Sequence, residues 1–198
     1  GIAHYIIHSY DYPELAQMGL NTARRYAEIA PASAHAQHMP SHIFTRLGLW
    51  DESISTNINS ASSAICYAES VNPEASWTQE IHAVDYLVYA YLQLGDNKKA
   101  LEQLNEMQAI KTVFPKDDFA SVYALTAIPV RVALENKNWK EVANLELPKI
   151  DFTWEKFSWE KAILHFGRSL GYSHIGNIAS AEQELQILKD LHQKLLDS

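Results

Sequence analysis

The segment LVYAYLQLGDNKKALEQLNEM, residues 87–107, contains two helical patterns separated by a turn. Apolar residues at steps of three and four precede Gly95, and Ala100, Leu104 and Met107 continue this spacing after it. A Gly followed by Asp and Asn is typical of one helix ending and another beginning. The segment therefore predicts a helical hairpin.

The same helix break recurs along the chain at intervals of about forty residues. Each copy is followed, five positions on, by a small or apolar residue, and a degenerate earlier copy, SYDYPELA, ends in Ala16. The breaks lie at Gly48 in LGLWDESI, Gly95 in LGDNKKAL, Asn136 or Lys137 in ENKNWKEV, and Gly176 in IGNIASAE. Strand signals are poor, so we predict an all-α chain whose residues 1–198 form a single domain of about five stacked hairpins.

The best copy resembles the tetratricopeptide repeat (TPR). It has the Leu, Tyr, Gly, Ala and Leu of that motif at Leu87, Tyr91, Gly95, Ala100 and Leu104. More narrowly, the segments HYIIHSYD, HMPSHIFTRLG and HAVDYLVYAYLQ are similar to those of an uncharacterised group of bacterial TPR-like proteins. The resemblance implies a right-handed α-solenoid in which the first helix of each hairpin lines the concave surface.

The composition argues against several classes of function. Sixteen Lys and Arg against twenty-four Asp and Glu give a net charge of −8, which disfavours nucleic-acid partners and anionic membrane surfaces. No apolar run approaches the roughly 20 residues of a membrane span. Cys66 is the only cysteine, so one chain can form neither a disulfide nor a thiolate metal cluster, and we expect this thiol in the core. Because the chain opens at Gly1 within a helical pattern, we expect a further segment upstream.

Histidines concentrate in three of the predicted helices, at spacings of three or four residues that place side chains on one helix face. They are His4 and His8 in HYIIHSYD, His35, His38 and His42 in HAQHMPSHIF, and His82 in IHAVDYLVYAY. His4 is the one that we expect to pack inward. The TPR register implies a ligand-binding concave surface that carries His8, His35, His38, His42, His82, Asp85 and Tyr89.

Two histidines four residues apart on a helix can bind one metal ion, as in HExxH sites. The predicted metal ligands are His8, His38, His42, His82 and Asp85. Asp85 acts either as a ligand or as the carboxylate that orients an imidazole. Such a set suits zinc, nickel, copper or ferrous iron, with zinc as the first choice, whereas calcium and magnesium prefer oxygen ligands.

Prolines complicate two of the predicted helices. If one helix runs through Pro40, His38 and His42 share a face; if a helix begins at Pro40, Met39 is expected to be extended and the two histidines separate. Pro129 falls inside another predicted helix, where we expect a kink or two abutting pieces.

Two functions fit these patterns. The first is a TPR-like scaffold whose concave face binds a protein, a peptide or a small ligand, with the His/Asp cluster providing polar specificity. The second is a metal-binding protein or metal-dependent enzyme with ligands from the first three hairpins. A purely structural interpretation competes with both, in which the histidines bond to carbonyls and Tyr hydroxyls at hairpin contacts. A serine nucleophile is disfavoured, because Ser9 and Ser41 adjoin histidines only in sequence and no GxSxG elbow exists.

Overall fold

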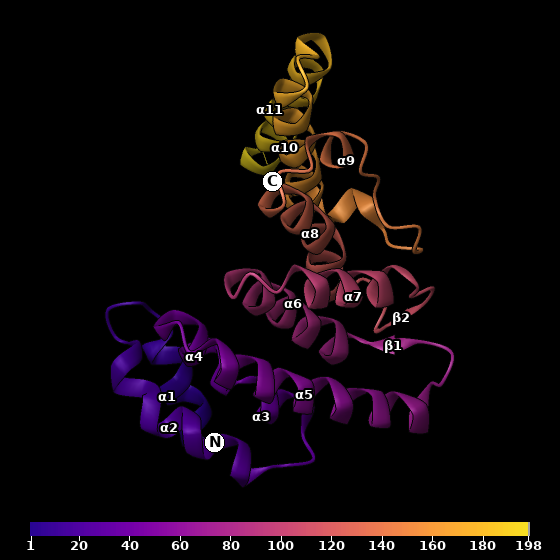
Figure 1. The fold of residues 1–198 in the computed structure, drawn as a ribbon. Helices are drawn as coiled ribbons and strands as arrows, with labels where there is room; N and C mark the ends of the chain where they lie inside the picture. Colours follow the sequence, from indigo (N-terminus) through magenta and orange to yellow (C-terminus); the bar gives the residue numbers. More distant parts are fainter. Residues whose placement is uncertain (198) are drawn as a thin grey trace. The chain divides into compact units, whose positions relative to one another are not determined.

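The computed structural model describes residues 1–197 and is almost entirely α-helical (Figure 1). It divides into two compact units, Gly1–Phe114 and Pro115–Ser198. The predicted all-α class is confirmed. The right-handed TPR-like solenoid and the single continuous domain stay predictions, and the two units are described separately below.

The first unit consists of helices and one pair of very short strands. The helices are α1 (Ile2–Tyr10), α2 (Ala16–Ile29), α3 (Ala34–His38), α4 (Pro40–Leu47), α5 (Trp50–Val71), α6 (Thr78–Gln93) and α7 (Asn97–Gln108). The strands β1 (Ser76–Trp77) and β2 (Val113–Phe114) pair in parallel, with Ser76 opposite Val113.

Helix α5 holds the first unit together by packing against α3, α4 and α6. On the other side of α4, helices α1 and α2 close an apolar core in which Ile7, Met39 and Ile43 are fully buried. Burying such side chains contributes about 1.5–3 kcal/mol each. This packing fixes the positions of α1, α3, α4 and α6, the four helices that carry the clustered histidines.

The junction between α3 and α4 differs from both arrangements expected around Pro40. Ser33 caps α3 by accepting a hydrogen bond from a first-turn amide, and α4 begins at Pro40 itself. Met39 keeps helical angles, φ −50° and ψ −39°, so its expected extended conformation is wrong. The clash that a proline imposes on its predecessor is outweighed here by the burial of Met39 in the core. A helical Met39 keeps His38 and His42 together.

The second unit is built around α10. Its elements are α8 (Phe119–Glu135), α9 (Trp139–Ala143), the 3₁₀ turn η1 (Trp154–Lys156), α10 (Ser158–His174) and α11 (Ile178–Leu196). Helix α10 packs against all the others. A Cβ atom at Gly171 would lie 2.6 Å from the backbone nitrogen of Ala143, so α9 can approach α10 this closely only at a glycine. Helix α8 continues through Pro129 as one helix, and the expectation of two abutting pieces is wrong.

The repeated helix breaks share one backbone conformation. The residues at the breaks all have positive φ, at 69° for Gly48, 72° for Gly95, 54° for Lys137 and 79° for Gly176. The residues five positions later are all buried, namely Ser53, Ala100, Val142 and Ala181. The repeat indicated by the sequence therefore has a common turn geometry and a common inward position in both units, and Lys137 rather than Asn136 occupies the break in ENKNWKEV.

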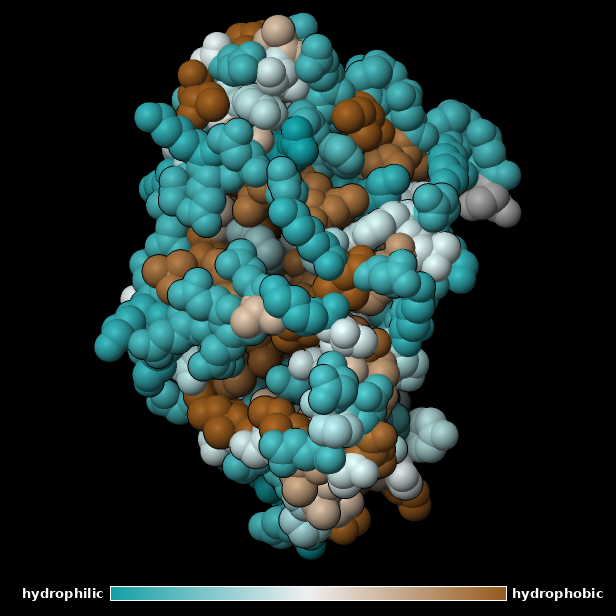
Figure 2. All heavy atoms as spheres, turned by 90° about the vertical axis from the view of Figure 1, so that its right-hand side faces the viewer, coloured by the Kyte–Doolittle hydropathy of each residue, from teal (hydrophilic) through white to brown (hydrophobic). Residues whose placement is uncertain are grey.

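The surface carries both polar and apolar side chains. Figure 2 shows one face on which hydrophilic side chains predominate and hydrophobic ones are interspersed. Cys66 is exposed on α5, so its expected place in the core is wrong; the buried face of that helix runs through Ala64 and Ala68 instead. None of the described helices is both long and apolar enough to span a membrane.

Lys137→Gly should stabilise the protein by up to about 1 kcal/mol, because glycine adopts positive φ without a steric cost. The reverse change at an equivalent break, Gly176→Ala, should destabilise it by about the same amount. A Cβ atom at Gly176 meets nothing within 4 Å, so only backbone strain is added there. Chemical denaturation measures both effects, and two variants with equal stability would contradict the shared left-handed turn.

Candidate metal centre

Six histidines converge in the first unit from four helices. They are His4 and His8 of α1, His35 and His38 of α3, His42 of α4, and His82 of α6. Neighbouring rings within this group, the imidazole array, have centroids from 4.3 Å apart (His38 and His82) to 6.5 Å apart (His35 and His38). The array grades from exposed rings at His8 and His35 to a buried ring at His38, which is only 1% exposed.

Inside the array, the Nε2 atoms of His38 and His42 lie 3.1 Å apart. The Nδ1 atom of His38 lies 2.7 Å from Oδ1 of Asn57. The amide nitrogen of Asn57 donates to the carbonyl of Ser53, which leaves the amide oxygen to face the ring. Nδ1 of His38 must therefore carry the proton, and its Nε2 presents a lone pair toward His42.

His42 is oriented in the same way by a carboxylate. Its Nδ1 atom lies 2.9 Å from Oδ2 of Asp11, and the other oxygen of Asp11 accepts a hydrogen bond from Arg46 at 2.8 Å. Burial alone would raise the pKa of Asp11, but the hydrogen bonds from His42 and Arg46 outweigh it and hold this pKa below its ordinary value. An ionised Asp11 can only accept, so Nδ1 of His42 donates to it and Nε2 is again the inward-facing atom.

Two inward-facing ring nitrogens at 3.1 Å repel each other unless a cation lies between them. A proton on one ring satisfies this requirement, and so does a metal ion. Two ring nitrogens bound to one ion at about 2.0–2.1 Å are about 2.9 Å apart at a right angle and about 3.3 Å apart at the tetrahedral angle. The separation in the structure falls between these limits, so the distance between the two nitrogens suits a shared metal ion as well as a shared proton.

His82 completes a group of three. His38, His42 and His82 each offer a ligand atom, and these atoms all lie within 4.8 Å of one another. Burial, followed by the neighbouring His82 and His42, lowers the pKa of His38 well below its usual value. His38 is therefore held neutral, which is the form that binds metals. These three histidines can hold a metal ion.

Tyr86 borders this group, one turn after His82 on α6. Its hydroxyl lies 3.3 Å from Nδ1 of His42, and its ring meets that of His38 edge-on with centroids 4.6 Å apart. Since Nδ1 of His42 already donates to Asp11, the hydroxyl oxygen serves as a second, weaker acceptor there. Tyr86 of α6 thus packs against the rings of His38 and His42.

The other predicted site residues lie around the three histidines. His8 is exposed and its ring centroid lies 5.7 Å from that of His42, whereas Asp85 is buried on α6 and lies outside the group of ligand atoms within 4.8 Å. Tyr89 contacts Trp50 edge-on. His35 contacts His4, so His4 lies within the array and is only partly buried, and its expected inward packing is wrong.

Two of the partner residues were not among the predicted site residues. Asp11 closes the segment HYIIHSYD, three residues after His8, and this spacing was the available signal. The sequence signal for Asn57 is weaker: Ser53, Asn57 and Ser60 follow one another at helical spacing and so share one face of the helix. In the structure all three are fully buried. The exposed face of α5 includes Ile58 and Ile65, so hydrophobicity alone indicates the wrong face of this helix.

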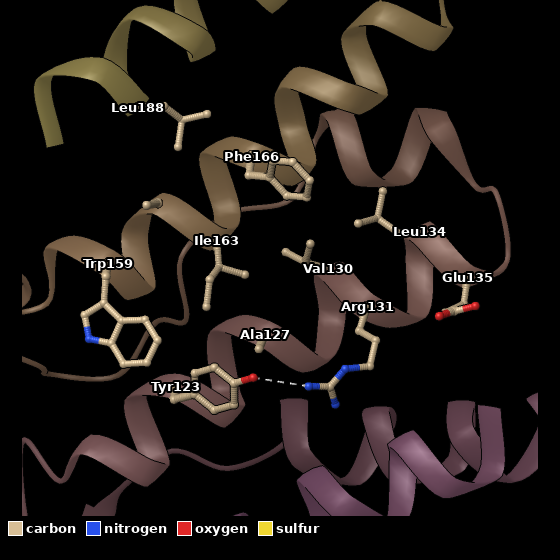
Figure 3. A pocket seen from close by; sticks show the side chains of 11 residues that line it. Tyr123, Ala127, Val130, Arg131, Leu134, Glu135, Trp159, Ile163, Phe166 and Leu188 are labelled. Carbon is tan, nitrogen blue, oxygen red and sulfur yellow. Dashed lines mark hydrogen bonds between the residues drawn. The ribbon is translucent and has the colours of Figure 1, made fainter. Parts of the chain in front are cut away.

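The second unit has a hollow of a different character, with a volume of about 510 Å³. Figure 3 shows that Tyr123 of α8 and Trp159, Ile163 and Phe166 of α10 line it. Arg131 donates a hydrogen bond of 3.5 Å to the hydroxyl of Tyr123 at its edge. This hollow is lined mainly by apolar and aromatic side chains. Among the residues that the structure describes, no group of possible metal ligands borders it.

Asn57→Ala should destabilise the metal-free protein by about 1–3 kcal/mol, because Nδ1–H of the buried His38 loses its acceptor. Thermal denaturation in the presence of a chelator measures this. The matched control is Asn21→Ala, at an exposed position of α2, which should change stability by no more than about 0.5 kcal/mol. Equal effects of the two substitutions would contradict the assigned hydrogen bond.

No protein-family model, curated protein or solved structure matches this chain.

Proposed function

We propose that the first unit binds a transition-metal ion through His38, His42 and His82, and that zinc is the ion it takes. The observation that carries this proposal is the pair of Nε2 atoms of His38 and His42 at 3.1 Å, each on a ring whose other nitrogen donates to a fixed acceptor. A hydrogen bond from the far nitrogen of each ring to a fixed acceptor is the arrangement found around metal-binding imidazoles.

The donor set decides which ions suit the site. Three neutral imidazoles favour zinc, copper, nickel or ferrous iron over calcium and magnesium. The acceptors behind the ligands are an amide oxygen at His38 and a carboxylate at His42, and they fix both ring orientations before any ion arrives. The carboxylate also holds the His42 ring in the orientation that a ligand needs.

A metal-dependent enzyme is the second candidate, favoured by the number of ligands. Structural zinc sites close with four protein ligands, whereas catalytic ones use three and leave a position for water or substrate. The group in the first unit has three histidines, with the hydroxyl of Tyr86 beside them. A bound zinc ion would lower the pKa of a water molecule in the open position.

The scaffold function stays a prediction alongside the metal site. A protein, peptide or small ligand on the predicted concave face would meet the exposed rings of His8 and His35 first. His38 is too buried for direct contact with a macromolecule. The contact between the buried His38 and His42 is therefore suited to a small ion rather than to a macromolecule.

Protein purified without a histidine tag and stripped with a chelator should bind zinc in competition with a chromophoric chelator. His38→Ala, His42→Ala and His82→Ala should each weaken the tightest site at least a hundredfold, because each removes one of three ligands. Zinc at a hundred times its Kd should stabilise the protein by about 2.7 kcal/mol, seen as a rise in Tm.

The matched control for the ligand variants is His192→Ala, at an exposed position of α11, which should bind zinc like the wild type. If the wild type and His82→Ala bind zinc equally weakly and zinc leaves the Tm unchanged, the proposed metal site does not exist.

Asp11→Asn should lower zinc affinity by about 10–100-fold while all three ligands remain, because the His42 ring loses its carboxylate. Isothermal titration of the metal-free variant measures the loss. Asp51→Asn, at an exposed residue in the first turn of α5, is the matched control and should leave the affinity unchanged. An Asp11→Asn variant with wild-type affinity would show that this carboxylate has no role in metal binding.

A further inference from the structure

A second pair of imidazoles in the array has nearly the same geometry as the first. Nε2 of His4 on α1 lies 3.0 Å from Nε2 of His35 on α3. This separation also falls between about 2.9 and 3.3 Å, the range set by two ring nitrogens bound to one ion. Neither residue belongs to the group formed by His38, His42 and His82.

His8 is the third ligand that the array offers, and its ring would have to turn to reach an ion between His4 and His35, because the ligand atoms of these three histidines do not all lie within 4.8 Å of one another. It lies one turn after His4 on α1, with its ring centroid 4.6 Å from that of His4 and 5.7 Å from that of His42. The His4–His8 spacing of four residues is the spacing that allows two histidines of one helix to reach a single ion. His8 therefore lies between the two imidazole pairs and on the exposed side of the array.

We propose that the array holds a second transition-metal ion, bound by His4 and His35 with His8 as the third ligand, so that the first unit is a two-ion centre. This inference rests on the proposed function, since it assumes that the same pocket is a metal pocket. The second position is more exposed than the first, and we expect it to bind more weakly and to lose its ion first.

The experiment is a zinc titration of the metal-free, tag-free full chain against a chromophoric chelator, with metal content measured after gel filtration. The wild type should bind two zinc ions per chain at saturation. His4→Ala and His35→Ala should each bind one, with the Kd of the remaining ion changed less than threefold. His82→Ala should retain the weaker ion, and His192→Ala should bind two. Circular dichroism checks that each variant is folded.

The outcomes separate the two proposals. One zinc ion in the wild type and one in His35→Ala would overturn the second site, leaving the His4–His35 contact as a plain hydrogen bond and the first site intact. Two ions in His4→Ala and His35→Ala would also overturn it, because the second ion would then lie elsewhere. Loss of both ions in a folded His35→Ala would show one shared site, and no binding by the wild type would overturn both proposals.

Discussion

Two ring nitrogens that point at each other require a positive charge between them, and the first unit is built so that the rings of His38 and His42 cannot turn away. Asn57 holds one ring and Asp11 the other. Either partner alone would leave one imidazole able to flip and relieve the repulsion. With both in place, the only remaining variable is which cation occupies the gap.

The buried polar residues of α5 both orient the His38 ring and hold α3 in place. Asn57 donates to Ser53 within α5, and the hydroxyl of Ser60 donates to the carbonyl of Ala34 at 2.7 Å. Ser60 thereby holds the first turn of α3 against α5, in the helix that carries His38. Buried polar groups are costly unless every member is bonded, and these residues meet that condition by serving as the support of the site. The stability of the unit and the orientation of its clustered histidines thus depend on the same hydrogen bonds.

Much of this could be predicted from the sequence, and the failures have physical causes. Apolar periodicity and the breaks at Gly48, Gly95 and Gly176 indicated an all-α chain with regular turns, because helical spacing and positive φ leave clear local signals. The predicted extended conformation of Met39 before Pro40 was wrong, because the burial of Met39 in the core outweighed the local steric preference. The contact between Asn57 and His38 is set by helix packing, and its only local sign in the sequence is the stripe of polar residues Ser53, Asn57 and Ser60.

The orientation of α5 also determines the position of Cys66. That helix turns its polar stripe inward, which leaves the only thiol of the chain on the outside. A maleimide dye would therefore attach at a single defined position, on the helix that supports His38 and without touching any of the clustered rings. The same thiol can join two chains through an intermolecular disulfide under oxidising conditions, so a reductant belongs in every solution experiment on this protein.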